Sequence, residues 1–213
     1  MQYEIAPNRW LSDFFGREIR EVKVQVQNVE QIQALQTQGF QFVEGELDFG
    51  LALVNYQPKM TACKPATEAD ISELESLFGN AFPMSRFRAP WFSRAENQRF
   101  YQTWIRNAVR AEFDDICFLL RATSGQIQGA ISVRVRDKQA RVGLLAVAPA
   151  FQRQGVAYQL LQAAIGWAQQ QGAISLSIAT QTSNLNAIRL YQKLGASLQQ
   201  ASYWFYLNKY DEL

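Results

Sequence analysis

The sequence predicts an α/β protein of the α+β kind, in which a mixed central sheet is flanked by helices. Apolar residues recur at helical spacing in several segments, and short apolar or alternating runs that are typical of strands lie between those segments. From residue 66 onward the order is two helices, three strands, a helix, a strand, a helix and a last strand. With 213 residues, the chain is long enough for a main domain and a smaller one.

The composition excludes several functions. The net charge of +2 is too small to favour nucleic acid or a membrane surface as a partner. We expect no signal peptide and no membrane-spanning segment, because no apolar run is long enough. The two cysteines form no disulfide pattern, which favours a reducing, cytoplasmic location. The chain has no histidine, so catalytic triads and metal sites that use histidine are excluded, and we expect no metal.

Residues 1–58 are expected to form a small N-terminal α/β module, and residues 62–213 the main domain. The module should contain a strand, a helix and a second strand, in that order, at 22–26, 29–38 and 40–54. Valines that alternate with polar residues predict the first strand, and apolar residues on one face predict the helix. Gly45 and Gly50, inside the second strand, indicate bulges or bends. Prolines near residue 60 mark the boundary between the two parts.

In the main domain, each expected helix carries an apolar stripe and each expected strand an apolar or alternating run. The helices are expected at 66–82, 96–112, 156–172 and 184–194. The strands are expected at 116–122, 127–136, 142–147, 174–178 and 201–207. A capping pattern, Thr67-x-x-Asp70, begins the first helix. Ser124-Gly125 and Asp137-Lys138 predict the two turns that connect the first three strands.

The segment Gln152-Arg153-Gln154-Gly155-Val156-Ala157, between a strand and a helix, is the strongest candidate for a binding site. The start of a helix exposes unpaired backbone N–H groups and the positive end of the helix dipole, and both favour phosphate. Gly155 and Ala157 leave the backbone open, and Arg153 adds positive charge. The alternative is a tight turn between strand and helix. Neither a P-loop nor a G-x-G-x-x-G pattern is present.

This loop, Gln-x-x-Gly-x-Ala after a strand that ends in Val-x-Pro, resembles the pyrophosphate loop of the GCN5-related N-acetyltransferases, the GNAT superfamily. A second signature of that family is matched by Asn184-x-x-Ala187-x-x-Leu190-Tyr191-x-Lys193-x-Gly195. The resemblance implies the GNAT fold, and acetyl-CoA as the co-substrate. The implied cofactor-binding residues are Leu145, Ala146, Val147, Gln152, Arg153, Gln154, Gly155, Val156, Ala157, Tyr158 and Asn184.

Further stretches resemble the bacterial family of TDP-fucosamine acetyltransferases, which N-acetylate the 4-amino group of a TDP-linked amino-dideoxy sugar for enterobacterial common antigen. They include Gly39-Phe-x-Phe-Val-Glu-Gly-Glu-Leu-Asp48, Ser85-Arg-Phe-Arg-Ala-Pro-Trp91 and Gly143-Leu-Leu-Ala146. The region between Gly16 and Gly39 is shorter than in that family. The resemblance implies a nucleotide-sugar substrate and a homodimer.

The resemblance makes Tyr191 the candidate general acid, which returns a proton to the thiolate of CoA. A phenol with a pKa of ~10 stays protonated at neutral pH. The alternative is a tyrosine that packs its helix against the sheet. Glu44 is the candidate base for the amine, with Glu46 and Asp48 as rivals and a solvated strand carboxylate as the alternative. Asn184 is expected to bond the cofactor, to cap its helix, or to do both.

Arg86 and Arg88 are expected to bind the TDP phosphates, because a guanidinium group matches two phosphate oxygens. Trp91 is expected to stack on a base or a sugar. The alternative for this segment is a solvated loop with its apolar residues packed beneath it. Two other functions stay open. One is an acetyltransferase of a protein or small-molecule amine, whose acceptor site should be acidic. The other is a CoA-binding module without catalysis.

Overall fold

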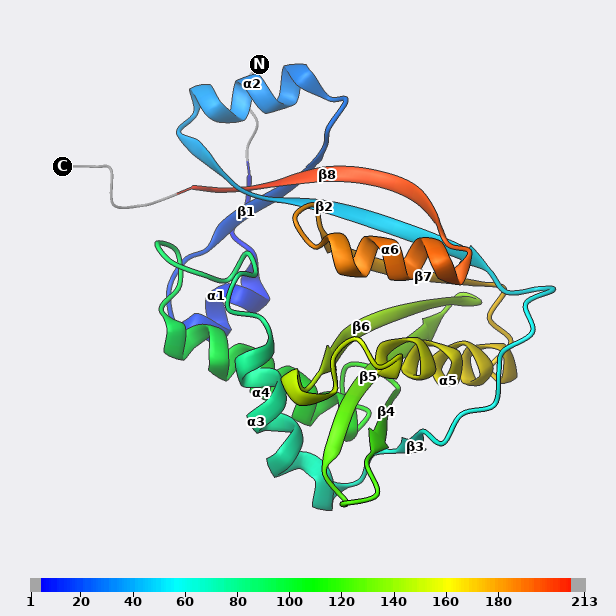
Figure 1. Ribbon diagram of the computed structural model, residues 1–213. Coiled ribbons are helices and arrows are strands. Elements are labelled where there is room, and N and C mark those ends of the chain that lie inside the picture. The colour runs from blue at the N-terminus through cyan, green and yellow to red at the C-terminus, as the bar shows by residue number, and fades with distance from the viewer. Residues whose placement is uncertain (1–4, 208–213) are drawn as a thin grey trace.

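The computed structural model describes residues 5–207 (Figure 1). Within them, eight strands form one sheet in the order β1-β8-β2-β7-β6-β5-β4-β3. Neighbouring strands are antiparallel except β6 and β7, which are parallel. The strands are β1 (Arg20–Gln25), β2 (Phe40–Ala52), β3 (Lys64–Pro65), β4 (Ile116–Arg121), β5 (Ile127–Arg136), β6 (Gln139–Val147), β7 (Ser175–Gln181) and β8 (Ser197–Leu207). The predicted mixed sheet with flanking helices is confirmed.

Helices cover both faces of this sheet (Figure 1). They are α1 (Arg9–Phe15), α2 (Val29–Thr37), α3 (Ile71–Ala81), α4 (Arg94–Val109), α5 (Val156–Gln170) and α6 (Leu185–Leu194), with 3₁₀ turns η1 (Glu68–Asp70) and η2 (Pro149–Phe151). Buried residues of α5 and α6 share one apolar cluster with the strands, and those of α1, α3 and α4 share a second one. Between residues 5 and 207, no helix has the length and apolar character that a membrane crossing requires.

Side chains at the helix ends explain where several helices begin. The predicted capping box of Thr67 and Asp70 is present at η1, just before α3. Ser93 and Glu96 form a second capping box at the start of α4. Each cap satisfies backbone N–H groups that the first helical turn leaves unpaired.

The segment predicted as an N-terminal module contributes two strands to the common sheet. β1 pairs with β8, and β2 lies between β7 and β8 along most of its length. The division into 1–58 and 62–213 therefore stays a prediction from the sequence, while the sheet continues across it. The irregularities expected at Gly45 and Gly50 occur as register shifts that lie just before these glycines, at Phe42/Glu44 and Asp48/Phe49. Helix α1 was not expected, because only Trp10, Phe14 and Phe15 gave an apolar signal there.

The parallel strands β6 and β7 separate soon after they begin to pair. Only three pairs join them, the last being Arg141 with Ser177. β6 then continues to Val147 and β7 to Gln181, and Figure 1 shows the two strands diverging. β7 keeps its antiparallel partner β2 as far as Gln181. The sheet is thus divided at its centre, between the carboxyl halves of two strands.

A β-bulge in β6 lies at the point of separation. Leu145 is opposite Ile131 of β5, and Val142 is opposite Val133. Three steps along β6 therefore match two steps along β5, so β6 holds one extra residue. A bulge of this kind bends its strand and increases the local twist. It turns the last part of β6 away from β7.

Candidate active site

A cavity of about 1240 Å³ lies where β6 and β7 separate. Its walls include the end of β6 from Val142 onward, the end of β7 from Ile178 to Gln181, and the segment 82–87 that follows α3. Asn184 and Tyr191 also line it. The motif that begins at Asn184 and the strand predicted at 142–147 therefore border the same cavity.

The free edge of β6 presents main-chain groups to this cavity. The Ala148 N–H donates to the carbonyl oxygen of Gln128 at 2.8 Å, next to β5. Since hydrogen-bonding groups alternate along a strand, those of Leu145 and Val147 point to the opposite side, where β7 has moved away. Such an edge is a ready template for an extended chain of amide groups. Leu145, Ala146 and Val147 all line the cavity.

The start of α5 leaves its main-chain N–H groups unpaired and open to approach. No backbone N–H from Arg153 to Tyr158 donates a hydrogen bond to another residue within 5–207. No side chain caps the helix, whose N-cap is Gly155 with φ 81°. A Cβ on Gly155 would meet no atom within 4 Å, so the approach is clear. Unpaired N–H groups and the dipole of this helix both favour a negative charge here.

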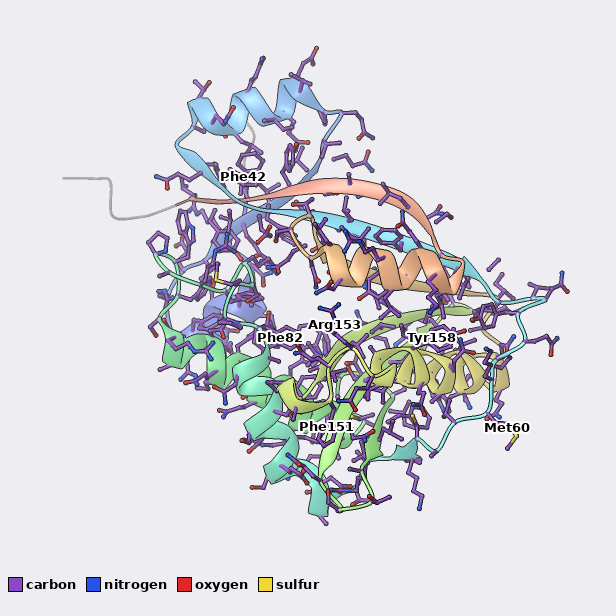
Figure 2. All side chains as sticks on the ribbon, viewed as in Figure 1. Phe42, Met60, Phe82, Phe151, Arg153 and Tyr158 are labelled. Carbon is purple, nitrogen blue, oxygen red and sulfur yellow. The ribbon has the colours of Figure 1, made fainter. Side chains whose placement is uncertain are left out.

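Side chains of the same loop hold it in place. Gln152 Nε2 donates to the Val147 carbonyl at 3.3 Å, and Gln154 Nε2 donates to the Ala150 carbonyl at 2.9 Å. The side chain of Val156 is buried in the core, so only its main chain faces outward. In Figure 2 the side chain of Arg153 points from the start of α5 toward α6. Arg153 adds its charge to the open amides.

Tyr191 is buried, with 4% of its surface exposed, and it lines the cavity. Its ring packs edge-on against Phe49, with the centroids 5.6 Å apart. Burial raises the pKa of its phenol. The ring thus packs α6 against the sheet, as the alternative interpretation expected. The residue also borders the cavity, and its role as general acid stays a prediction.

Asn184 caps α6, as one interpretation expected. Its Oδ1 accepts the N–H of Ala187 at 3.2 Å. The residue also lines the cavity, so a contact with a cofactor stays a prediction. Glycine ends the same helix, because Gly195 has φ 94°.

Glu44 lines the cavity, but an ion pair already engages it. Its Oε2 accepts Arg88 Nη1 at 2.9 Å and Gln181 Nε2 at 3.1 Å. Its rivals are also paired: Lys23 Nζ lies 2.6 Å from Glu46 and 2.6 Å from Asp48. Burial alone would lower the pKa of Lys23, but its hydrogen bonds to these carboxylates raise it.

The two arginines that were predicted to bind phosphate differ in position. Arg86 lines the cavity, where its guanidinium lies 3.8 Å from the centre of the Trp204 ring and pairs with Glu21. Arg88 is not among the residues that line the cavity. It donates to Glu44 and to the carbonyls of Met84, Ser85 and Val43, at 2.9–3.0 Å. Arg88 thus fastens the segment after α3 to β2.

Trp91 packs within the protein, with its ring edge-on to Tyr206 at 5.4 Å between centroids. Trp204 of β8 lines the cavity instead. Polar residues without a predicted role also line it, among them Lys23, Arg134, Arg141 and Gln181. They are single positions on strands, and only the strand pairing brings them to one face.

A protein-family model described as "Acetyltransferase (GNAT) family" matches residues 74–196. The chain therefore belongs to the GNAT acetyltransferase family and is an N-acetyltransferase. Enzymes of this family use acetyl-CoA.

Within the family, the chain is 40% identical over 187 residues to dTDP-fucosamine acetyltransferase of Escherichia coli O6:H1, covering 87% of this chain and 80% of that protein. It is 28% identical over 146 residues to the spore coat polysaccharide biosynthesis protein SpsD of Bacillus subtilis, covering 67% of this chain and 49% of that protein. An acetyltransferase of the GNAT family from Colwellia psychrerythraea has the same fold, with a TM-score of 0.62 at 16% identity over 97% of this chain and 76% of that chain.

Substitution of Arg88 tests whether its hydrogen bonds hold the segment after α3 against β2. We expect Arg88→Ala to lower the free energy of unfolding by about 1–3 kcal/mol, because three carbonyls and the half-buried Glu44 each lose a donor. Chemical denaturation measures this. The control is Arg110→Ala, which removes an exposed ion pair with Glu68 and should leave the denaturation midpoint unchanged. If Arg88 instead bound substrate alone, Arg88→Ala would keep full stability.

Proposed function

We propose that this chain transfers the acetyl group of acetyl-CoA to the 4-amino group of a TDP-linked amino-dideoxy sugar of the TDP-fucosamine type. The observation that carries the proposal is the 40% identity, over 87% of the chain, to a dTDP-fucosamine acetyltransferase. The product would serve the synthesis of a cell-surface polysaccharide, of the enterobacterial common antigen type. A homodimer, which the same resemblance implies, and a cytoplasmic location, which the cysteine pattern favours, belong to this proposal.

The donor would lie along the free edge of β6. The pyrophosphate of acetyl-CoA would accept the open amides from Arg153 to Tyr158, with the Arg153 side chain beside them. The amide groups of the pantetheine arm would pair with the main chain of Leu145 and Val147. This arm would direct the thioester into the cavity, toward Tyr191 and Asn184. Support comes from the position of Gln152, which lines the cavity together with Leu145, Ala146 and Val147 and directly precedes the open amides.

In the reaction, the neutral amine attacks the thioester carbonyl carbon. A C–N bond forms, the C–S bond breaks, and the thiolate of CoA takes a proton from the phenol of Tyr191. The raised pKa of this phenol favours the protonated form that a general acid needs. The attacking amine must lose a proton, and Glu44 would receive it through water. Within residues 5–207, Glu44 Oε1 accepts a hydrogen bond only from the neighbouring Gly45 N–H, at 3.0 Å.

The lining of the cavity carries charges of both signs. Four cationic side chains border it, namely Lys23, Arg86, Arg134 and Arg141, together with the carboxylates Glu44, Glu46 and Glu73. Each of the four cations is paired with a carboxylate of the protein. A diphosphate would be attracted by the guanidinium groups and a polyamine by the carboxylates, so the choice of an anionic acceptor rests on the related sugar acetyltransferase. Of the two arginines predicted from the sequence, Arg86 is the one that can meet the sugar diphosphate. Trp204, beside Arg86, offers the aromatic surface that Trp91 was expected to offer.

The acceptor is tested directly with a panel of amines. The purified protein and radiolabelled acetyl-CoA are incubated with TDP-linked 4-amino and 3-amino sugars, a polyamine and a lysine peptide. We expect transfer to the TDP-4-amino sugars and none to the polyamine. Transfer to the peptide or polyamine alone would overturn the proposed substrate. CoA binding without any transfer would favour a non-catalytic module.

The general acid is tested by Tyr191→Phe. We expect kcat to fall by roughly 10²–10⁴, since general acid catalysis contributes that much, while the affinity for acetyl-CoA is kept. Tyr203→Phe, on the outer part of β8, is the matched control and should keep wild-type turnover. Because burial raises the phenol pKa above ~10, the wild-type rate should not fall through phenol ionisation between pH 7 and ~10. Unchanged turnover of Tyr191→Phe would remove this residue from the mechanism.

A further inference from the structure

A buried polar chain lies beneath the bulge of β6. Asp114, between α4 and β4, has no exposed surface. Its carboxylate accepts Trp104 Nε1 at 3.0 Å, Ser132 Oγ at 2.6 Å and Arg134 Nη1 at 2.7 Å. Ser132 Oγ in turn accepts the main-chain N–H of Leu144 at 2.9 Å. A continuous path of hydrogen bonds thus joins a buried carboxylate to the strand that borders the cavity.

This path meets β6 at the bulge itself. The extra residue of β6 lies between Val142 and Leu145, and the Leu144 N–H is satisfied there by the Ser132 hydroxyl. A Cβ on Gly143 would lie 2.2 Å from Asp114 Oδ2, so the carboxylate occupies the space that glycine leaves free. A buried amide without an acceptor is costly, so these two side chains stabilise the bulged form of the strand.

The bulge decides which main-chain groups of β6 point into the cavity. One residue beyond Leu144, the main chain of Leu145 faces the cavity. Without the bulge the alternation of the strand would reverse, and a different set of main-chain groups would point to the cavity. Neither Asp114 nor Ser132 takes part in the reaction described above, and Ser132 is fully buried.

We propose that Asp114 and Ser132 are positioning residues of the donor site. They hold the bulge at Gly143–Leu144, and so direct Leu145 and Val147 toward the pantetheine arm of acetyl-CoA. The inference rests on the proposed function, because it assumes that this arm binds along β6. It separates two parts of the donor site: the strand edge depends on the buried pair, and the amides at the start of α5 do not.

The test compares two ligands by calorimetry in Ser132→Ala. We expect the Kd of CoA to rise about tenfold, as for the loss of one or two hydrogen bonds. The Kd of 3′-phosphoadenosine 5′-diphosphate, the part of CoA that lacks the pantetheine arm, should stay the same. The matched control is Ser177→Ala. It removes a serine hydroxyl that bonds the Ala140 carbonyl of β6 at 3.3 Å, before the bulge, and should change neither Kd.

An unchanged Kd of CoA in Ser132→Ala would overturn the inference. So would a parallel loss for both ligands, because that would indicate a general loss of structure. If Ser132→Ala does not fold, Ser132→Cys, which keeps a side chain of similar size, undergoes the same two titrations with the same expected result. A wild-type protein that binds no CoA would overturn the proposed function. If the wild type binds CoA and Ser132→Ala binds it equally tightly, only the role of the buried pair is overturned.

Discussion

The site depends on the separation of β6 from β7 after their third residue pair. Two strands inside a sheet normally satisfy each other's main-chain groups, and here the carboxyl halves do not. Groups left without partners in a protein interior carry a cost, which a ligand with matching groups removes. The free edge of β6 and the open amides at the start of α5 are two adjoining examples. Both are places where the fold leaves hydrogen bonds for another molecule to complete.

Local signals in the sequence were sufficient for the elements that carry this arrangement. Gly155 lies where a left-handed N-cap begins α5, and Asn184 and Gly195 begin and end α6. Strand and helix periods predicted most elements to within a few residues, because each pattern repeats within one segment. The motifs at 152–157 and 184–195 predicted the family, and the comparisons with known proteins confirmed it.

The order of the strands in the sheet could not be predicted from these local signals. No local pattern indicates that β2 lies between β7 and β8, since strand neighbours are set by contacts far apart in sequence. The roles of the arginines depended on this placement: Arg88 meets the carbonyl of Val43 at the bulge of β2, and so fastens a loop. Trp91 and Trp204 are chemically alike, and only the fold decides which of them borders the cavity.

The most direct test of the account is the structure of the protein crystallised with CoA. We predict that the diphosphate lies within hydrogen-bonding distance of the amides from Arg153 to Tyr158. The pantetheine arm should be extended along Leu145 and Val147, and the sulfur should lie beside the phenol of Tyr191. A CoA molecule bound outside the space between β6 and β7, or a sulfur remote from that phenol, would contradict the account.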